Sequence, residues 1–147
     1  MLVEIRPEPF DPFAEMGAYQ SRLQPVGCSG AMASFIGTLR DSNEGVAVSE
    51  MQLEHYPGMT EKHLHAICSE AAAKWALQDC LVLHRSGQIH VGETIVLVAT
   101  WAAHRGDALD ACRFIIEDLK SKAPFWKKER LEGSERWVEK NTPGHSN

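Results

Sequence analysis

A short basic stretch that also holds two aromatic residues is the part of this sequence best suited to chemistry. Its charged residues are Lys120, Lys122, Lys127, Lys128, Glu129 and Arg130. Phe125 and Trp126 lie among the lysines, directly after Pro124. If these rings exclude water from one or two amines, burial and mutual repulsion lower a lysine pKa from about 10.4 towards neutrality. A neutral amine is a nucleophile and a base, so the stretch predicts a catalytic site.

The same lysines also have a purely structural explanation. The stretch follows a predicted helix, and a helix C-terminus favours cations, so Lys120 and Lys122 would then be solvated residues of the last turn. The charge distribution bears on this choice: residues 120–130 carry +4, the whole chain carries −5, and the remainder therefore carries −9. A concentrated positive patch on an acidic chain indicates a local anion site, and it disfavours binding to nucleic acid or to membranes.

Two arginines are candidates for the same anion site. Arg105 follows His104 where a predicted buried strand, residues 94–102, leads into the last helix. Backbone N–H groups and the helix dipole favour an anion at such a junction, and a guanidinium adds a forked donor. A packing role for His104 beside a solvated Arg105 is equally open. Arg40 begins a polar loop, residues 40–45, that we expect to be mobile, and it would complete a phosphate pocket with the other cations.

Other kinds of site find no support in the sequence. There is no GxSxG, Walker, GxGxxG or HExxH motif. The four cysteines form no CxxC pair and the histidines have no metal-ligand spacing, so we expect free thiols and no metal. The tryptophans are expected in the core or at an interface. An enzyme that uses its own amines and guanidinium groups is therefore the form of catalysis that the residues leave open, beside the structural explanation of the same side chains.

The length and composition predict one soluble domain. A chain of 147 residues corresponds to a single domain, here residues 1–147. It has no apolar run of roughly 18 residues and no basic, apolar leader, which predicts a cytoplasmic protein without a membrane span. Residues 1–29 form a less clearly defined N-terminal part, and residues 140–147 are expected to be a flexible tail.

Periodicity and turn signals predict an α+β fold. Helices are expected at residues 12–23, capped by Asp11, from residue 60, capped by Thr60, and from residue 106 to Pro124. The expected strands are residues 31–37, 46–56 with a bulge near Ser49 and Glu50, 80–84, 88–91, 94–102 and 135–139. The turns between strands are too short for most parallel crossovers, so the sheet should be largely antiparallel.

Several motifs together resemble one enzyme family. They are Phe35 to Asp41, Leu53 to Thr60, Ala103 to Arg105, Lys120 to Glu129 and Arg136 to Glu139. In this order they are similar to the MoaE family, the large catalytic subunit of molybdopterin synthase. The resemblance covers roughly residues 30–139, which is most of the chain.

The resemblance implies a fold, a reaction and partners. The fold is an α/β hammerhead with an added antiparallel subdomain. A homodimer lies at the centre of a heterotetramer, with a small ubiquitin-like sulfur-carrier subunit (MoaD-like) docked at each end. The carrier's C-terminal Gly-Gly thiocarboxylate enters a pocket of the large subunit. Two sulfur atoms then pass to the pterin substrate, cyclic pyranopterin monophosphate, to form the dithiolene of molybdopterin, without a metal or other cofactor.

The resemblance also implies roles for individual residues. Lys120 and Lys127 match the catalytic lysines: Lys120 activates or transiently accepts the carrier's terminal carbonyl, and Lys127 stabilises negative charge and shuttles protons. The residues that match substrate-binding positions are Thr38, Leu39, Arg40, His104, Arg105, Lys128 and Glu129. Lys140 is a further candidate that would supply charge across the dimer.

Two alternatives to the enzyme remain open from the sequence. In the first, the chain is a non-catalytic module whose basic segment docks the acidic tail of a partner protein. In the second, it is a small RNA-binding protein, which the negative charge outside the basic stretch and the lack of a base-stacking motif disfavour.

Overall fold

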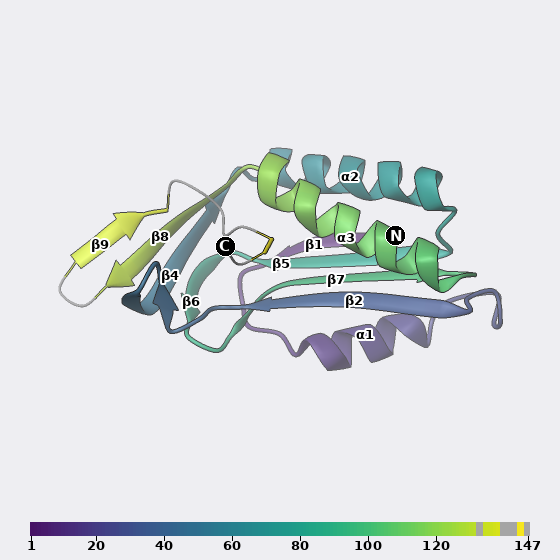
Figure 1. Ribbon diagram of the computed structural model, residues 1–147, viewed down its shortest axis with the longest axis horizontal. Coiled ribbons are helices and arrows are strands. Elements are labelled where there is room, and N and C mark those ends of the chain that lie inside the picture. Colours follow the sequence, from purple (N-terminus) through teal and green to yellow (C-terminus); the bar gives the residue numbers. More distant parts are fainter. Residues whose placement is uncertain (132–133, 139–143, 146–147) are drawn as a thin grey trace.

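The computed structural model describes residues 1–131, 134–138 and 144–145, which form twelve elements (Figure 1). The predicted site residue Lys140 and most of the predicted tail lie outside this part of the chain. The elements are β1 (Leu2–Arg6), α1 (Pro12–Gln20), β2 (Ala31–Thr38), β3 (Ser42–Asn43), β4 (Val46–His55), α2 (Met59–Trp75), β5 (Asp79–Arg85), β6 (Gly87–His90), β7 (Thr94–Ala102), α3 (Arg105–Lys122), β8 (Phe125–Leu131) and β9 (Ser134–Trp137).

The first sheet has the strand order β1-β5-β7-β2 and lies between layers of helices. Only the β1–β5 pair is parallel, and β5, β7 and β2 pair antiparallel. Helices α2 and α3 cover one face and α1 the other (Figure 1). Each face has its own core, with Leu64 and Ile115 among the buried residues on the α2–α3 side and Met16 and Trp101 on the α1 side. This packed layer fixes the position of α3.

The second sheet extends beyond one end of the first. It has the order β3-β4-β8-β9, with β6 also paired to β4, and all its pairs are antiparallel. Its register shifts between Val48 and Glu50, which confirms the predicted bulge. The α+β class with largely antiparallel sheets is therefore confirmed.

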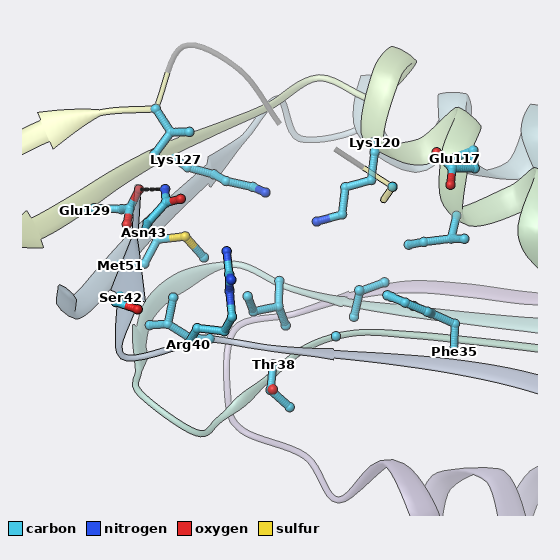
Figure 2. Close-up of a pocket in the computed structure, with 17 residues that line it drawn as sticks. Phe35, Thr38, Arg40, Ser42, Asn43, Met51, Glu117, Lys120, Lys127 and Glu129 are labelled. Atoms are coloured by element: carbon cyan, nitrogen blue, oxygen red, sulfur yellow. Dashed lines mark hydrogen bonds between the residues drawn. The ribbon is translucent and has the colours of Figure 1, made fainter. Parts of the chain in front are cut away.

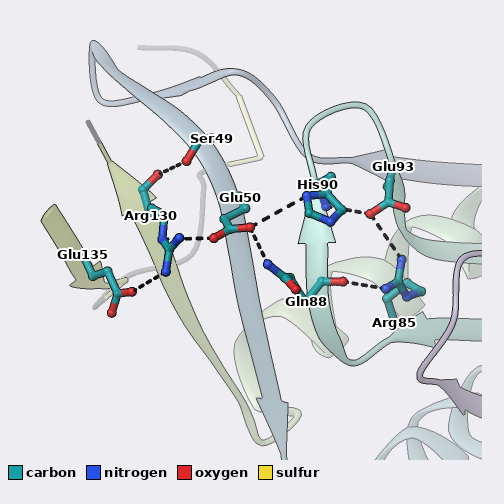
Figure 3. Close-up of polar contacts among 8 residues, drawn as sticks. All are labelled: Ser49, Glu50, Arg85, Gln88, His90, Glu93, Arg130 and Glu135. Atoms are coloured by element: carbon teal, nitrogen blue, oxygen red, sulfur yellow. Dashed lines mark hydrogen bonds and ion pairs between the residues drawn. The ribbon is translucent and has the colours of Figure 1, made fainter. Parts of the chain in front are cut away.

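Charged side chains connect four strands on the outer face of the second sheet (Figure 3). The Glu50 carboxylate accepts from Arg130 Nε at 3.0 Å and from the amide of Gln88, and Arg130 reaches Glu135 at 3.2 Å. Arg85 donates to the carbonyl of Gln88 at 2.8 Å. These contacts join β4 and β8 on the outer face. The side chains on the opposite face of β8, among them Lys127 and Glu129, are turned towards the end of the first sheet.

Three local predictions need correction. Strands β1 and β8 were not expected, and β8 turns the basic stretch after Pro124 into a strand. The segment 40–45 is not an irregular loop, because Ser42 and Asn43 pair with β4 as β3. Its turn has positive φ at Glu44 and Gly45, as tight hairpins require, and glutamate is not a residue that signals such a turn.

The N-cap of α2 also differs from the prediction. Helix α1 is capped as expected, with the Asp11 carboxylate accepting from the backbone of Phe13 at 2.9 Å. Helix α2 instead begins after Gly58, whose N–H donates to Glu61. The buried Thr60 hydroxyl donates to the Pro124 carbonyl at 3.1 Å, which connects α2 to the residue before β8.

Candidate active site

A pocket of about 410 Å³ lies where the end of the first sheet meets the second (Figure 2). Its first wall is formed by α3 and the end of β2, with Phe35 and Ile116 as apolar residues. Its second wall is formed by β8 and the hairpin of β3 and β4. The potentially reactive residues that line it are Thr38, Arg40, Asn43, Lys120, Lys127 and Glu129. The pocket thus brings together chemistry-bearing residues from two distant parts of the chain, 38–43 and 120–129.

Lys120 enters the pocket from the last turn of α3. Burial, together with repulsion from Lys127, lowers its pKa to about 7. The sequence analysis expected both Phe125 and Trp126 to exclude water from the lysines. Phe125 does line a small cavity beside Lys120 and Lys127, whereas Trp126 is 47% exposed and lies on the other face of β8. Around neutral pH a substantial fraction of Lys120 is therefore an uncharged amine, able to act as a nucleophile or base.

Lys127 faces Lys120 from β8, and Figure 2 shows the two side chains extending towards each other. Alternation along the strand places Phe125, Lys127 and Glu129 on the side of the pocket. Burial lowers the pKa of Lys127, while a hydrogen bond from its ammonium to the Lys120 amine and the nearby Glu129 oppose that shift. The pair consequently favours one neutral and one charged amine, with Lys127 as the cation.

Glu129 is almost fully buried and connects the second wall to the β3–β4 hairpin. Its Oε1 accepts from Asn43 Nδ2 at 2.7 Å, and Arg136 donates to the Asn43 carbonyl at 3.1 Å. Arg136 also lies 3.9 Å from the Glu129 carboxylate. These contacts hold the segment that carries Arg40. Sequence reasoning missed Asn43 and the function of Arg136, and no local signal would have identified them.

The other predicted substrate-binding residues are divided between the pocket and other surfaces. Arg40 extends into the space below the two lysines (Figure 2). Thr38 and Leu39 also line the pocket, but the Thr38 side chain points away from the lysines. Lys128 does not line this pocket, because alternation turns it to the outer face of β8, where its ammonium pairs with Glu135 at 2.8 Å and lies over the Trp137 ring.

His104 and Arg105 lie at the opposite end of α3 from Lys120. His104 is the N-cap residue and Arg105 begins the helix, and both are exposed. Fifteen residues separate Arg105 from Lys120, which corresponds to about 22 Å along an α-helix. Within one chain these residues therefore do not join the pocket.

Two further observations limit the kinds of site on the chain. Within residues 1–131, 134–138 and 144–145, no cluster of three or more histidine, cysteine or acidic side chains is arranged to hold a metal ion. In the same part of the chain, no helix combines the length and the apolar character that a membrane span requires. Cys28 is exposed, whereas Cys68, Cys80 and Cys112 are buried, and all four are free thiols.

Comparison with known proteins identifies the family. The family model described as MoaE protein matches residues 5–122. A molybdopterin synthase catalytic subunit of Ralstonia nicotianae is 50% identical over 137 residues, which cover 93% of this chain and 76% of the relative.

Solved structures agree in both fold and family. The crystal structure of molybdopterin synthase from Staphylococcus aureus matches this chain with a TM-score of 0.82. The two are 31% identical, and the match covers 92% of this chain and 96% of that one. A complex of subunits 1 and 2 of the molybdopterin-converting factor from Helicobacter pylori has a TM-score of 0.77 at 20% identity, covering 94% and 90% of the two chains, and shows the fold alone. The resemblance drawn from the motifs is confirmed: the chain belongs to the MoaE family of molybdopterin synthase catalytic subunits.

Proposed function

We propose that the pocket between α3 and β8 is where this chain, as a molybdopterin synthase catalytic subunit and a sulfurtransferase, carries out sulfur transfer. The observation that carries the proposal is the pair of buried amines, Lys120 and Lys127, beside Arg40 in one cavity. The alternative of a non-catalytic binding module is not supported, because a docking surface needs neither burial nor a lowered lysine pKa.

The cations of the pocket suit an anionic substrate. Arg40 offers a forked donor to a phosphate, and the Lys127 ammonium supplies a second positive charge. A volume of about 410 Å³ lies within the range of pockets that enclose small organic ligands. We assign the cyclic phosphate of the pterin to Arg40 and Lys127, and the pterin ring to the apolar wall that includes Phe35 and Ile116.

The neutral amine of Lys120 suits the carbonyl chemistry of a thiocarboxylate carrier. When the carrier's sulfur has bonded to the pterin, the two are joined through a thioester. The Lys120 lone pair then attacks the thioester carbonyl, or takes a proton from a water that attacks it. If the amine attacks, a carrier–Lys120 amide forms as the carbonyl–sulfur bond breaks, and water must then cleave that amide to free the carrier. If water attacks, the carrier leaves directly as its carboxylate. In both cases the sulfur remains on the pterin as a thiolate. The Lys127 ammonium stabilises the oxyanion that forms on the carbonyl oxygen.

A second copy of the chain would bring His104 and Arg105 to this pocket. Strand β2 is an edge strand that pairs with β7 in the described part of the chain, and it exposes Met32 and Phe35. Antiparallel pairing of two β2 strands about their middle would set the start of one beside the end of the other. The start of β2 adjoins Ala102, just before His104, whereas its end lines the pocket. Such a homodimer completes each site with the other copy's Arg105.

The small carrier subunit is the second partner that we propose. The complex of subunits 1 and 2 of the molybdopterin-converting factor from Helicobacter pylori contains a chain with the fold of this one, which supports an assembly of this kind. With the β2 dimer at its centre, the assembly would be a heterotetramer. The cytoplasmic location inferred from the sequence stays a prediction.

Reconstitution tests the catalytic assignment. Purified chain, a thiocarboxylated carrier and the cyclic pterin should yield molybdopterin, whereas the double variant Lys120→Ala/Lys127→Ala should yield none. Lys122→Ala is the matched control, because Lys122 is exposed on the same helical turn and pairs with Asp118 at 2.8 Å. Full activity of the double variant would disprove the assignment.

Mixing two inactive variants tests the composite site. A Lys120→Ala chain and an Arg105→Ala chain, unfolded and refolded together, should form heterodimers in which one of the two pockets is intact. Activity should then rise well above that of either variant alone. If each pocket uses its own chain's residues only, the mixture will stay as inactive as its components.

A further inference from the structure

A buried histidine lies directly behind the two lysines, and the chemistry proposed above does not use it. His84 is on β5 between Val96 of β7 and Ile5 of β1, and only 1% of it is exposed. The preceding residues of the strand, Leu81 to Leu83, are apolar. An imidazole in such surroundings costs folding free energy unless its nitrogen atoms are hydrogen-bonded, so an apolar residue would serve the sheet better.

The contacts of the His84 ring define its protonation. Nδ1 lies 2.8 Å from the carbonyl oxygen of Arg85, and because a carbonyl only accepts, Nδ1 carries a hydrogen. The ring stacks on Phe125 with centroids 3.9 Å apart. Burial lowers the His84 pKa to about 3, and the neighbouring cations act in the same direction. The ring is therefore neutral at physiological pH, and Nε2 carries a lone pair that can only accept.

A small cavity joins this ring to the catalytic lysines. It has a volume of about 20 Å³ and is lined by His84, Lys120 and Lys127 together with apolar atoms of Phe125 and its neighbours. That volume is sufficient for one water molecule, which would have three polar partners there. The titratable groups that face His84 come from three elements: Lys120 on α3, Lys127 on β8 and His55 on β4.

We infer that His84 is a positioning residue for Lys120. Its Nε2 accepts an N–H of the Lys120 amine, directly or through one water in the small cavity, and so directs the amine's lone pair away from β5, towards Lys127 and the main pocket. This inference rests on the role proposed above for Lys120. A carboxylate at the same place would also orient the amine, but it would stabilise the ammonium and raise the lysine pKa. A neutral acceptor orients Lys120 and leaves it reactive.

Two substitutions separate this role from a purely structural one. His84→Phe keeps the aromatic stack on Phe125 and removes the acceptor, whereas His84→Gln keeps an acceptor and removes the ring. We expect kcat to fall about tenfold in His84→Phe with the KM for the pterin unchanged, and to recover most of that loss in His84→Gln. If the ring serves only packing, the order of the two variants will be reversed, and that order would overturn the inference.

A measurement on the unaltered His84 ring does not depend on turnover. Nitrogen NMR of the wild-type chain should show His84 protonated at Nδ1 only, with no titration between pH 5 and 9. The Nε2 resonance should move in Lys120→Ala and stay in place in Lys122→Ala. A protonated Nε2, or a resonance unaffected by Lys120→Ala, contradicts the inference. The two proposals fail in different ways. Full activity of Lys120→Ala would disprove the catalytic role of Lys120, whereas an unchanged Nε2 resonance in that variant would disprove its contact with His84.

Discussion

The two walls of the pocket are held in place by different forces. The α3 and β2 wall belongs to the packed first layer, where Ile115, Leu119 and Val96 are almost fully buried. In the β8 and hairpin wall, β8 pairs with β4 along its backbone and Met51 and Leu53 are buried. The hairpin that carries Arg40, however, is fixed to β8 by polar contacts between side chains, above all those of Glu129 with Asn43 and Arg136. Packing in a core is strong and spread over many contacts, whereas a few polar contacts are individually weak. We therefore expect changes in the first wall to affect folding and changes in the second to affect substrate binding.

The largest effect is expected in the first wall. Ile115→Ala removes a fully buried side chain from the core between α3 and the sheet, which should lower the free energy of unfolding by about 3 kcal/mol. Trp137→Ala on β9 is the contrast, since half of that side chain is exposed, and we expect a loss below about 1 kcal/mol. Denaturant unfolding measures both. Equal losses would show that the second sheet is as tightly packed as the first.

The pH dependence of turnover is the next largest effect, and it reports on the amine that the first wall buries. Because the Lys120 pKa is about 7, its neutral fraction falls about tenfold per unit as the pH drops further below 7. We expect kcat at pH 5 to be about a hundredfold below its value at pH 8, in the wild type and in Lys122→Ala alike. A kcat that is constant from pH 5 to 8 would show that no neutral amine is needed.

Stability offers a second check of the same shift, with a defined sign. Unfolded Lys120 keeps the ordinary pKa of 10.5, so between about pH 7 and 10.5 the unfolded chain binds a proton that the folded chain lacks. Stability should therefore rise with pH across that window. Lys120→Met removes this contribution, and its advantage in Tm over the wild type should shrink from pH 6 to pH 10.

The same difference between the walls explains what the sequence made predictable. The strand at residues 94–102 was predicted with its observed bounds, because it is buried on both faces and reads as an apolar run. Strand β8 was missed because its inward residues include Lys127 and Glu129, which line the pocket, so the alternation of apolar and polar residues is lost. Residue type and aromatic neighbours made Lys120 a candidate but left a solvated last turn open, and its catalytic role came from the family resemblance.

Contacts between distant residues account for the rest. Asn43 and Glu129 are 86 positions apart, and neither residue type nor spacing indicates their hydrogen bond. The distance between Arg105 and the pocket was also not predicted. The last helix was expected, but the sequence analysis did not use its length to place Arg105 and Lys120 at opposite ends of that helix. Family resemblance supplied Glu129 and Arg105 but not Asn43, and only the structure gave the contacts of all three.

The smallest effect is expected from the hydrogen bond between the hairpin and β8. Asn43→Asp replaces a donor by a carboxylate facing the Glu129 carboxylate, and the repulsion should displace the hairpin that carries Arg40. A hydrogen bond to a charged group is worth about 1.5–3 kcal/mol, and the exposed hairpin can relax, so we expect the KM for the pterin to rise about tenfold with kcat retained.

A second substitution shows whether this contact causes the change. In Asn43→Asp/Glu129→Gln the glutamine amide can donate to the new aspartate, which restores the bond with donor and acceptor exchanged. The KM should return to within about threefold of the wild-type value. The remaining difference is the effect of removing the Glu129 charge, which raises the pKa of the nearby Lys127. Glu129→Gln alone measures that loss. If the KM of the double variant is as high as that of Asn43→Asp, other contacts hold the hairpin. The second wall would then be fixed mainly by packing, like the first.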